Sequence, residues 1–199
     1  MIAVVDYRAG NLTSVCKALR ALDCDPVVTD DPAVLRTAEK IILPGVGHFA
    51  ATERLFSSGI ADAIRERVTQ GAQFLGICVG LQWIFSGSTE APLSPGLKVF
   101  PEQCERFPET VKCPHVGWNS LDIVQPSRLL RGLDPGTFVY FTHSYRAPRV
   151  KATVAVTDYA GNFSAVVEDG NWMAVQFHPE KSGPAGLKIL QNFLELPRC

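Results

Sequence analysis

The sequence has 199 residues, a length that predicts one domain or at most two small ones. Hydrophobic residues make up 46% and charged residues 20%, a globular composition that excludes wholesale disorder. With 19 basic and 20 acidic residues the net charge is −1, so neither nucleic acid nor an anionic membrane is an expected partner. No apolar run approaches the ~20 residues of a membrane span, and the N-terminus lacks the basic segment of a signal peptide.

The cysteines give no sign of a disulfide framework or a zinc site, because no two of them have C-x-x-C spacing. They are Cys16, Cys24, Cys78, Cys104, Cys113 and Cys199. A chain of this length buries a core without disulfides, so we expect reduced thiols, a cytoplasmic location and no bound metal. We expect most of these side chains to act as small hydrophobic residues.

In the first half, apolar runs alternate with segments whose apolar residues recur at helical spacing. The predicted strands are residues 2–5, 26–29, 40–43 and 73–77, and the predicted helices are residues 12–22, 49–56, 60–68 and 79–85. Asn11 is at the N-cap position of the first helix. This alternation implies parallel strand pairing with right-handed crossovers.

The second half changes character, since prolines interrupt residues 90–115 and short strand patterns follow. The predicted strands are residues 120–124, 137–142, 153–157, 164–168 and 171–177, with a hairpin turn at 169–171 and a last helix over 182–194. We therefore predict one α/β domain over residues 1–199. Its sheet is expected to be open, mixed and mostly parallel, with flanking helices.

The pentapeptide Gly76-Ile77-Cys78-Val79-Gly80 lies between a predicted strand and a predicted helix. It has the layout of a nucleophile elbow, G-x-S-x-G, with cysteine in place of serine. Glycines leave room around a nucleophile whose backbone is strained, and the helix N-terminus favours a thiolate. For the pentapeptide alone, a buried cysteine in a glycine-flanked turn is the alternative.

His178 is one of four histidines, and its neighbours set it apart. His178 follows the carboxyl end of the predicted strand 171–177, as Cys78 follows that of the predicted strand 73–77. Functional sites of open α/β sheets collect at that edge. Glu180 follows two residues later, and residues i and i+2 of an extended chain face the same side. The Glu180 carboxylate could thus orient one nitrogen of the His178 imidazole while the other nitrogen faces a thiol. For the segment H-P-E alone, a plain turn at the end of a strand is the alternative.

A second glycine-rich turn, Pro44-Gly45-Val46-Gly47, ends the predicted strand 40–43. Acyl transfer needs amide donors where the oxyanion develops, and this turn and the amide of Val79 could supply them. Residues 45–50 also fit the dinucleotide fingerprint G-x-G-x-x-A. We discount that alternative because the fingerprint normally lies in the first βα turn and needs an acidic residue at the end of the next strand, whereas the next predicted element here is a helix. A plain tight turn is the other alternative.

The remaining histidines have ordinary explanations. We expect His143 to end a strand and to be satisfied by the backbone, and His115 to be packed in a loop. His48 is expected to line the oxyanion turn or to face solvent.

The order of P-G-V-G, G-I-C-V-G and H-P-E along the chain resembles that of the class I, triad-type glutamine amidotransferases, over nearly the whole sequence. Within that family, four segments are similar to glutaminase subunits of imidazole glycerol phosphate synthases: residues 6–12, 115–119, 140–145 and 178–182. Val116 departs from the methionine expected there, a difference that concerns packing.

The resemblance implies that Cys78 attacks the carboxamide of glutamine, while His178 transfers protons and Glu180 orients it. It implies that Gly45, Val46, Gly47 and Val79 hold the oxyanion, and that Gln82, Ser144 and Tyr145 hold the amino-acid end of the substrate. It implies no cofactor.

The resemblance also implies a partner, a (β/α)8-barrel cyclase subunit that forms a heterodimer with this chain and receives the ammonia. Asn11, Tyr140 and Lys181 match interface positions of the family; for Lys181 alone, a solvated charge is the alternative. The products would be imidazole glycerol phosphate and aminoimidazole carboxamide ribotide, in histidine biosynthesis.

Three other functions remain open from the sequence. The chain could be the glutaminase subunit of another synthase, such as that of pyridoxal phosphate. It could be a cysteine peptidase or γ-glutamyl hydrolase on the same scaffold, although it has no insertion for a peptide cleft. It could also be a non-catalytic interaction module, which an intact triad pattern argues against.

Overall fold

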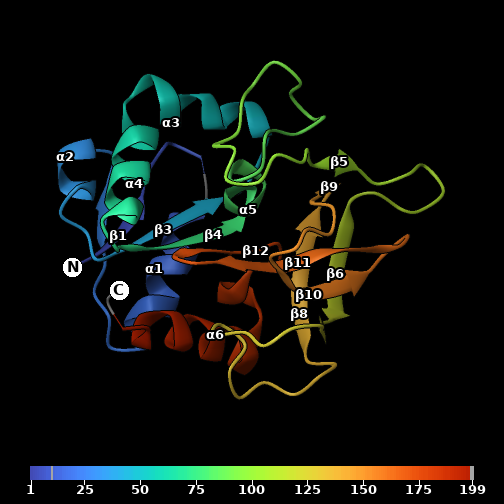
Figure 1. Cartoon of the computed structure of the whole chain (residues 1–199). Helices are drawn as coiled ribbons and strands as arrows, with labels where there is room; N and C mark the ends of the chain where they lie inside the picture. Colours follow the sequence, from blue (N-terminus) through green and yellow to red (C-terminus); the bar gives the residue numbers. More distant parts are fainter. Residues whose placement is uncertain (10, 198–199) are drawn as a thin grey trace.

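The computed structural model describes residues 1–9 and 11–197, so Gly10 of the 6–12 segment and Cys199 lie outside the described residues. A large sheet runs through the centre of the molecule (Figure 1). Its strands are β1 (Ile2–Val5), β2 (Val27–Thr29), β3 (Lys40–Gly45), β4 (Gln73–Cys78), β7 (Asp122–Ile123), β10 (Thr153–Asp158), β11 (Asn162–Asp169) and β12 (Trp172–Val175).

The sheet has eight strands in the order β2-β1-β3-β4-β12-β11-β10-β7. Pairing is parallel from β2 to β12 and antiparallel from β12 to β7, which confirms the predicted mixed, mostly parallel sheet. All residues of β3 and β4 are buried, as expected for central parallel strands covered on both faces. The carboxyl ends of β3, β4 and β12 therefore meet at one edge.

Helices cover both faces of this sheet (Figure 1). The helices are α1 (Leu12–Arg20), α2 (Pro32–Leu35), α3 (Glu53–Ser57), α4 (Ile60–Thr69), α5 (Val79–Trp83) and α6 (Gly183–Glu195), with 3-10 turns η1 (Phe49–Thr52) and η2 (Pro179–Lys181). In the view of Figure 1, α3 and α4 lie above the sheet, and α1 and α6 lie below it. Among the described residues, no helix combines the length and the apolar composition needed to cross a membrane.

Two short two-stranded sheets complete the structure: β6 (His115–Ser120) with β8 (Phe138–His143), and β5 (Glu105–Arg106) with β9 (Tyr145–Arg146). The β6–β8 pair is antiparallel, with His115 opposite His143 and Trp118 opposite Tyr140. Its two faces differ, because Val116, Trp118 and Phe138 are more than half exposed whereas His115 and His143 are buried.

Most predicted elements occur, with a few corrections. Residues 49–56 form a 3-10 turn followed by α3, instead of one α-helix. Residues 120–124 divide between the end of β6 and β7, and the prediction that His115 lies in a loop is wrong because it begins β6. Gly117 and the preceding prolines hide this strand in the sequence, since both residue types are typical of turns.

The C-terminal helix α6 follows directly after η2 and contacts it at Gly186. A Cβ atom at Gly186 would lie 1.9 Å from the Pro179 carbonyl oxygen and 2.9 Å from the Ser182 Cβ. Only glycine fits this contact, which holds η2 against the body of the protein.

Gly186→Ala is expected to lower the free energy of unfolding by about 2–3 kcal/mol, because the added methyl group overpacks the contact with η2. Urea unfolding measures the change. Gly136→Ala is the control: its site has open space and a φ of +81°, so it carries only a backbone cost of about 1 kcal/mol. Equal losses in the two variants would contradict the proposed overpacking.

Candidate active site

Cys78 ends β4 and precedes α5 with an unusual backbone conformation, φ 55° and ψ −105°. Non-glycine residues rarely adopt a positive φ, and such strain persists only where the surroundings enforce it. Here the chain turns so sharply that a Cβ at Gly76 would lie 2.4 Å from the Gly80 carbonyl oxygen. At Gly80 a Cβ would lie 2.1 Å from the Leu43 carbonyl oxygen. The two glycines are thus sterically required, as the elbow pattern predicts.

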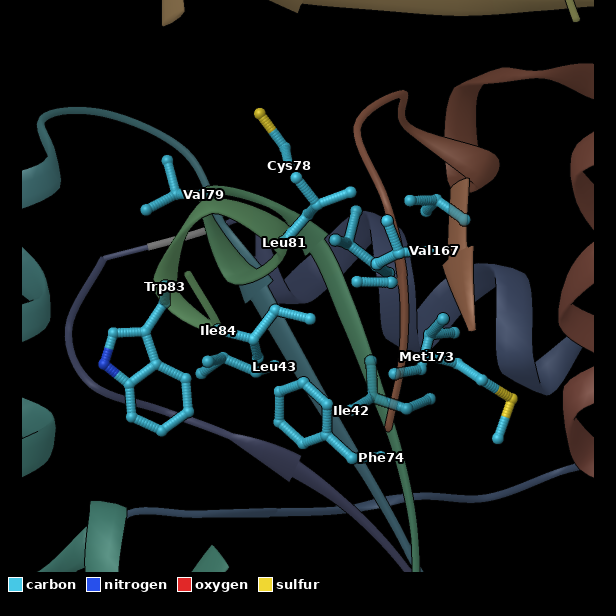
Figure 2. Packing of buried hydrophobic residues seen from close by; sticks show 14 of the residues in the cluster. Ile42, Leu43, Phe74, Cys78, Val79, Leu81, Trp83, Ile84, Val167 and Met173 are labelled. Atoms are coloured by element: carbon cyan, nitrogen blue, oxygen red, sulfur yellow. The ribbon is translucent and has the colours of Figure 1, made fainter. Parts of the chain in front are cut away.

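The elbow directs the Cys78 side chain away from the hydrophobic core. In Figure 2 its sulfur points out from the packed side chains of Leu81, Ile84 and Phe74. It borders a pocket of about 230 Å³. The pocket is lined by Val46, Gly47, Cys78, Val79, Gln82, Glu90, Pro114, Thr142, His143, Ser144 and Tyr145. All the predicted oxyanion and substrate residues except Gly45 therefore line one pocket with Cys78, and Gly45 pairs with Cys78 in the sheet.

Strand β12 ends at Val175, two residues before the predicted end at 177, and His178 and Glu180 form a buried pair shortly after it. The His178 Nδ1 lies 2.9 Å from the Glu180 Oε1, and both side chains are 1% exposed. Among the described residues, neither the His178 Nε2 nor the Glu180 Oε2 has a hydrogen-bond partner. The imidazole is therefore held at one nitrogen and left available at the other.

Cys78 and His178 come together because β12 pairs in parallel with β4, with Val175 opposite Ile77. Both residues therefore lie at the same edge of the sheet. Burial lowers the pKa of His178, but Cys78 and the Glu180 carboxylate both raise it, and the net result is a pKa of about 10. The site thus contains a cysteine, a histidine and a carboxylate, the groups that a nucleophile, a base and an orienting partner require.

Ser182 fixes the position of this histidine through the backbone. Its hydroxyl donates to the His178 carbonyl at 2.7 Å and accepts from the Tyr140 amide at 2.9 Å. The His178 amide donates to the Tyr140 carbonyl at 2.9 Å. The segment that carries His178 is therefore connected to β8 by both its amide and its carbonyl.

Two buried side-chain amides extend from the sulfur along the pocket wall. The Gln176 Nε2 donates to the Cys78 Sγ at 3.7 Å, and the Gln82 Nε2 donates to the Gln176 Oε1 at 3.4 Å and to the Tyr145 carbonyl at 3.0 Å. The Gln82 Oε1 has no partner among the described residues. It is a buried acceptor at the pocket wall, available to a donor on a ligand.

The end of β3 and the turn after it lie beside the elbow, and Val46 and Gly47 line the pocket. Gly45 pairs with Cys78, and a Cβ at Gly45 would lie 2.6 Å from the Tyr7 hydroxyl and 2.7 Å from the Val79 Cβ. Gly47 has a φ of +103°. The Glu90 carboxylate accepts from the Phe49 amide at 2.8 Å, so it fixes the segment that follows this turn.

The predicted interface residues lie outside the pocket. The Lys181 Nζ is 5.9 Å from the centre of the Tyr140 ring, which contacts the exposed Trp118 edge-on. Asn11 precedes α1, which packs against η2, although its side chain makes no capping hydrogen bond. His48 is exposed, and its Nδ1 accepts from the Ala50 amide. Within residues 1–9 and 11–197, no group of three His, Cys, Asp or Glu side chains could hold a metal.

Sequence reasoning missed Gln176, Ser182, Glu90 and Tyr7. Gln176 could have been found, because it precedes His178 by two residues and an extended chain directs both to the same side. Ser182 closes the H-P-E-K-S segment, but nothing local predicts its bond to β8. Glu90 and Tyr7 come from loops whose course only the fold determines.

Comparisons with known proteins identify the family to which the chain is similar. The family model described as "Glutamine amidotransferase class-I" matches residues 3–196. The chain is 45% identical to the "Imidazole glycerol phosphate synthase subunit HisH" of Methanothermobacter thermautotrophicus, over 100% of both chains. It is 46% identical to the subunit of the same name from Moorella thermoacetica, over 99% of this chain and 95% of the relative.

Solved structures show the same fold at lower identity. A structure described as "Crystal structure of glutamine amidotransferase" aligns with a TM-score of 0.77 at 21% identity and covers 98% of both chains. The structure of PurLQS from Thermotoga maritima aligns with a TM-score of 0.74 at 20% identity, over 97% of this chain and 96% of that one.

The raised pKa of His178 makes stability depend on pH. Below its ordinary pKa of 6.5, the folded and unfolded chains both carry the proton, and the stabilisation is complete. Between pH 6.5 and about 10 only the folded chain retains it, so the contribution of the His178–Glu180 pair to the free energy of unfolding should fall as pH rises. Glu180→Gln should flatten this fall, because it removes one group that raises the pKa.

Urea unfolding from pH 6 to about 10 measures both curves. Glu195→Gln is the matched control, since Glu195 is half exposed and pairs with Arg131. Its curve should run parallel to that of the unmodified chain. If the Glu180→Gln curve is also parallel, the pair does not hold the proton as described.

Proposed function

The chain belongs to the class I glutamine amidotransferase family, and we propose that it is the glutaminase subunit of an imidazole glycerol phosphate synthase in histidine biosynthesis. In this role it hydrolyses L-glutamine to glutamate and ammonia. The observation that carries the proposal is the buried pair of His178 and Glu180 beside a cysteine on a strained elbow.

The triad performs the reaction in two stages. The thiolate of Cys78 attacks the carboxamide carbon of glutamine, and His178 delivers a proton to the nitrogen, which leaves as ammonia. The remaining thioester is attacked by water, from which His178 removes a proton, and glutamate is released with the thiolate restored. Glu180 holds the imidazole at Nδ1 throughout, so Nε2 serves both transfers.

The oxyanion of each tetrahedral intermediate is held by amides of the turn Gly45-Val46-Gly47 and of Val79. Such donors act strongly because they are fixed before the reaction and lie in a site that excludes water. Removal of one donor commonly costs about a hundredfold in rate.

The pocket suits an amino acid. Its volume of about 230 Å³ is below the ~300–1,000 Å³ of typical drug-sized ligand pockets. Glu90 is the acidic residue in its lining and fits an α-ammonium group, whereas Gln82, Ser144 and Tyr145 fit the rest of the amino-acid end. A peptidase would need a longer groove for residues on both sides of the cleaved bond, so this volume favours a glutaminase.

The partner is a (β/α)8-barrel cyclase subunit, which forms a heterodimer with this chain and consumes the ammonia. Free ammonia is mostly protonated at neutral pH and is then no nucleophile, so a closed passage between subunits keeps it reactive. The exposed face of β6–β8, with Trp118, Phe138 and Tyr140, adjoins η2, the turn that contains Glu180 and Lys181. Together with Asn11, these residues form the proposed partner face.

Two alternative functions differ from the proposed one in the partner that they require or the product that they release. The glutaminase subunit of another synthase would bind a different partner, which a pull-down with candidate synthases would identify. A peptidase would release peptides from a casein digest, which a glutaminase would leave intact. A location in the cytoplasm is part of the proposal, and it is supported by the free thiols of Cys16, Cys24, Cys78, Cys104 and Cys113.

Cys78→Ala is expected to lower glutamate release by about 10⁴-fold or more, because no other group forms the thioester. The assay follows glutamate with the chain alone and with the cyclase and its ligand, which should increase the rate. Cys24→Ala is the control and should retain activity, since Cys24 lies away from the pocket. Undiminished release by Cys78→Ala would rule out the mechanism.

Trp118→Ala should weaken binding to the cyclase by about tenfold or more, as expected for a large aromatic side chain in the middle of an interface. Calorimetric titration measures the dissociation constant. Val28→Ser is the control, because Val28 is 44% exposed on β2, at the other end of the large sheet from β10 and β7. Similar losses in both variants would mean that this face is not the contact.

A further inference from the structure

The mechanism leaves two buried histidines without a role. His115 and His143 lie opposite each other on the inner face of β6–β8, with the His115 Nδ1 3.0 Å from the His143 Nε2. Aromatic rings enclose them: His115 stacks between Tyr159 and Phe141, with ring centres at 4.1 and 4.9 Å. His143 also borders the pocket beside Cys78.

The hydrogen bonds of this pair admit one placement of protons. The His143 Nδ1 lies 2.8 Å from the Tyr145 carbonyl, which can only accept, so this nitrogen carries the proton. The His143 Nε2 is then an acceptor, and the His115 Nδ1 must donate to it. The His115 Nε2 is left as an acceptor.

Asn119 supplies the donor that the last acceptor needs. Its Nδ2 lies 3.4 Å from the His115 Nε2 and also donates to the Asp158 carbonyl at 3.1 Å. Its Oδ1 accepts from the Ser120 amide at 2.8 Å, which fixes the orientation of the side-chain amide. Every donor in the relay therefore points from Asn119 toward the pocket.

Both imidazoles stay neutral, as this arrangement requires. Burial lowers the pKa of His115 to about 4 and that of His143 to about 3. A second proton on either ring would place two donors face to face, so the relay has one stable protonation state near neutral pH.

The relay ends on a group that the substrate pocket depends on. The Tyr145 carbonyl accepts from the His143 Nδ1 and from the Gln82 Nε2, so both of its acceptor positions are used. Gln82, Ser144 and Tyr145 line the pocket.

On the basis of the proposed glutaminase function, we propose that His115 and His143 are positioning residues that set glutamine affinity. Their one-way hydrogen-bond relay fixes the Tyr145 carbonyl and, through it, the Gln82 side chain. Neither ring exchanges a proton with the substrate. Disturbance of the relay should therefore raise KM for glutamine and leave kcat nearly unchanged.

The proton positions are tested directly by nitrogen NMR of the full chain labelled with ¹⁵N-histidine. At pH 7 both rings should have the proton on Nδ1, whereas free histidine in water carries it mainly on Nε2. Protons on Nε2 in both rings would overturn the proposal.

Asn119→Asp reverses the relay, because a carboxylate accepts a hydrogen bond where the amide donated one. His115 should then carry its proton on Nε2, and the His143 donor to Tyr145 should be lost or require a second proton. KM for glutamine should rise about fivefold, the effect of one lost hydrogen bond, with kcat within about twofold. The chain is assayed without the cyclase, so that loss of partner contacts near Trp118 does not contribute.

Two controls separate positioning from folding. Asn119→Ala removes the first donor but keeps the direction of the relay, so its KM should stay within about twofold. Phe163→Leu loosens the packing around both rings, which Phe163 contacts edge-on, without changing a hydrogen bond of the relay. Its proton positions and KM should match those of the unmodified chain. If KM rises equally in Asn119→Asp and in either control, the proposal is overturned.

Failure of the proposed function is distinguishable from failure of the relay. If the unmodified chain releases no glutamate, the glutaminase assignment falls, and the NMR proton positions still decide whether the relay exists. Calorimetric glutamine binding in a Cys78→Ala background, with and without Asn119→Asp, then replaces KM. If Asn119→Asp moves the His115 proton from Nδ1 to Nε2 and the affinity for glutamine is unchanged, the positioning role is overturned.

Discussion

The parallel pairing of β4 with β12 is the contact on which the active site depends. It brings the carboxyl ends of two strands to one edge of the sheet, with Val175 opposite Ile77. Cys78 ends one of these strands, and His178 follows the other. Because both strands are buried among other elements, a shift of register would move every side chain to the wrong face, so this pairing is strongly specified.

The neighbouring strand β3 enforces the strain at Cys78. Its Leu43 carbonyl lies against Gly80, and its Gly45 lies against Val79 and Tyr7. A backbone held in a rare conformation needs such rigid surroundings, and the buried central strands provide them. The proposed nucleophile and the proposed oxyanion turn therefore depend on the same close packing of β3 against the elbow.

Polar groups inside the protein follow a consistent pattern around the site. Five buried side-chain atoms of the described residues have no partner, and three of them belong to His178, Glu180 and Gln82. Other buried polar side chains near the site are satisfied, as in the relay of His115 and His143 and in the contacts of Ser182. Buried groups without partners are costly, so their concentration at the active site fits a site completed by a ligand.

The sequence by itself determined the local chemistry. The glycines on both sides of Cys78, the spacing of His178 and Glu180, and the alternation of strands and helices are properties of short segments. Steric demands and chain periodicity act within a few residues, so they can be read directly. The same is true of the family resemblance, which rests on such segments.

Only the tertiary structure decided which distant groups meet. Ser182 between η2 and β8, Glu90 against the turn after β3, and the pairing of His115 with His143 all join segments far apart in sequence. Strand β6 was also missed, because its glycine and the prolines before it resemble a loop until β8 pairs with it. These contacts depend on strand order and packing, which no local pattern encodes.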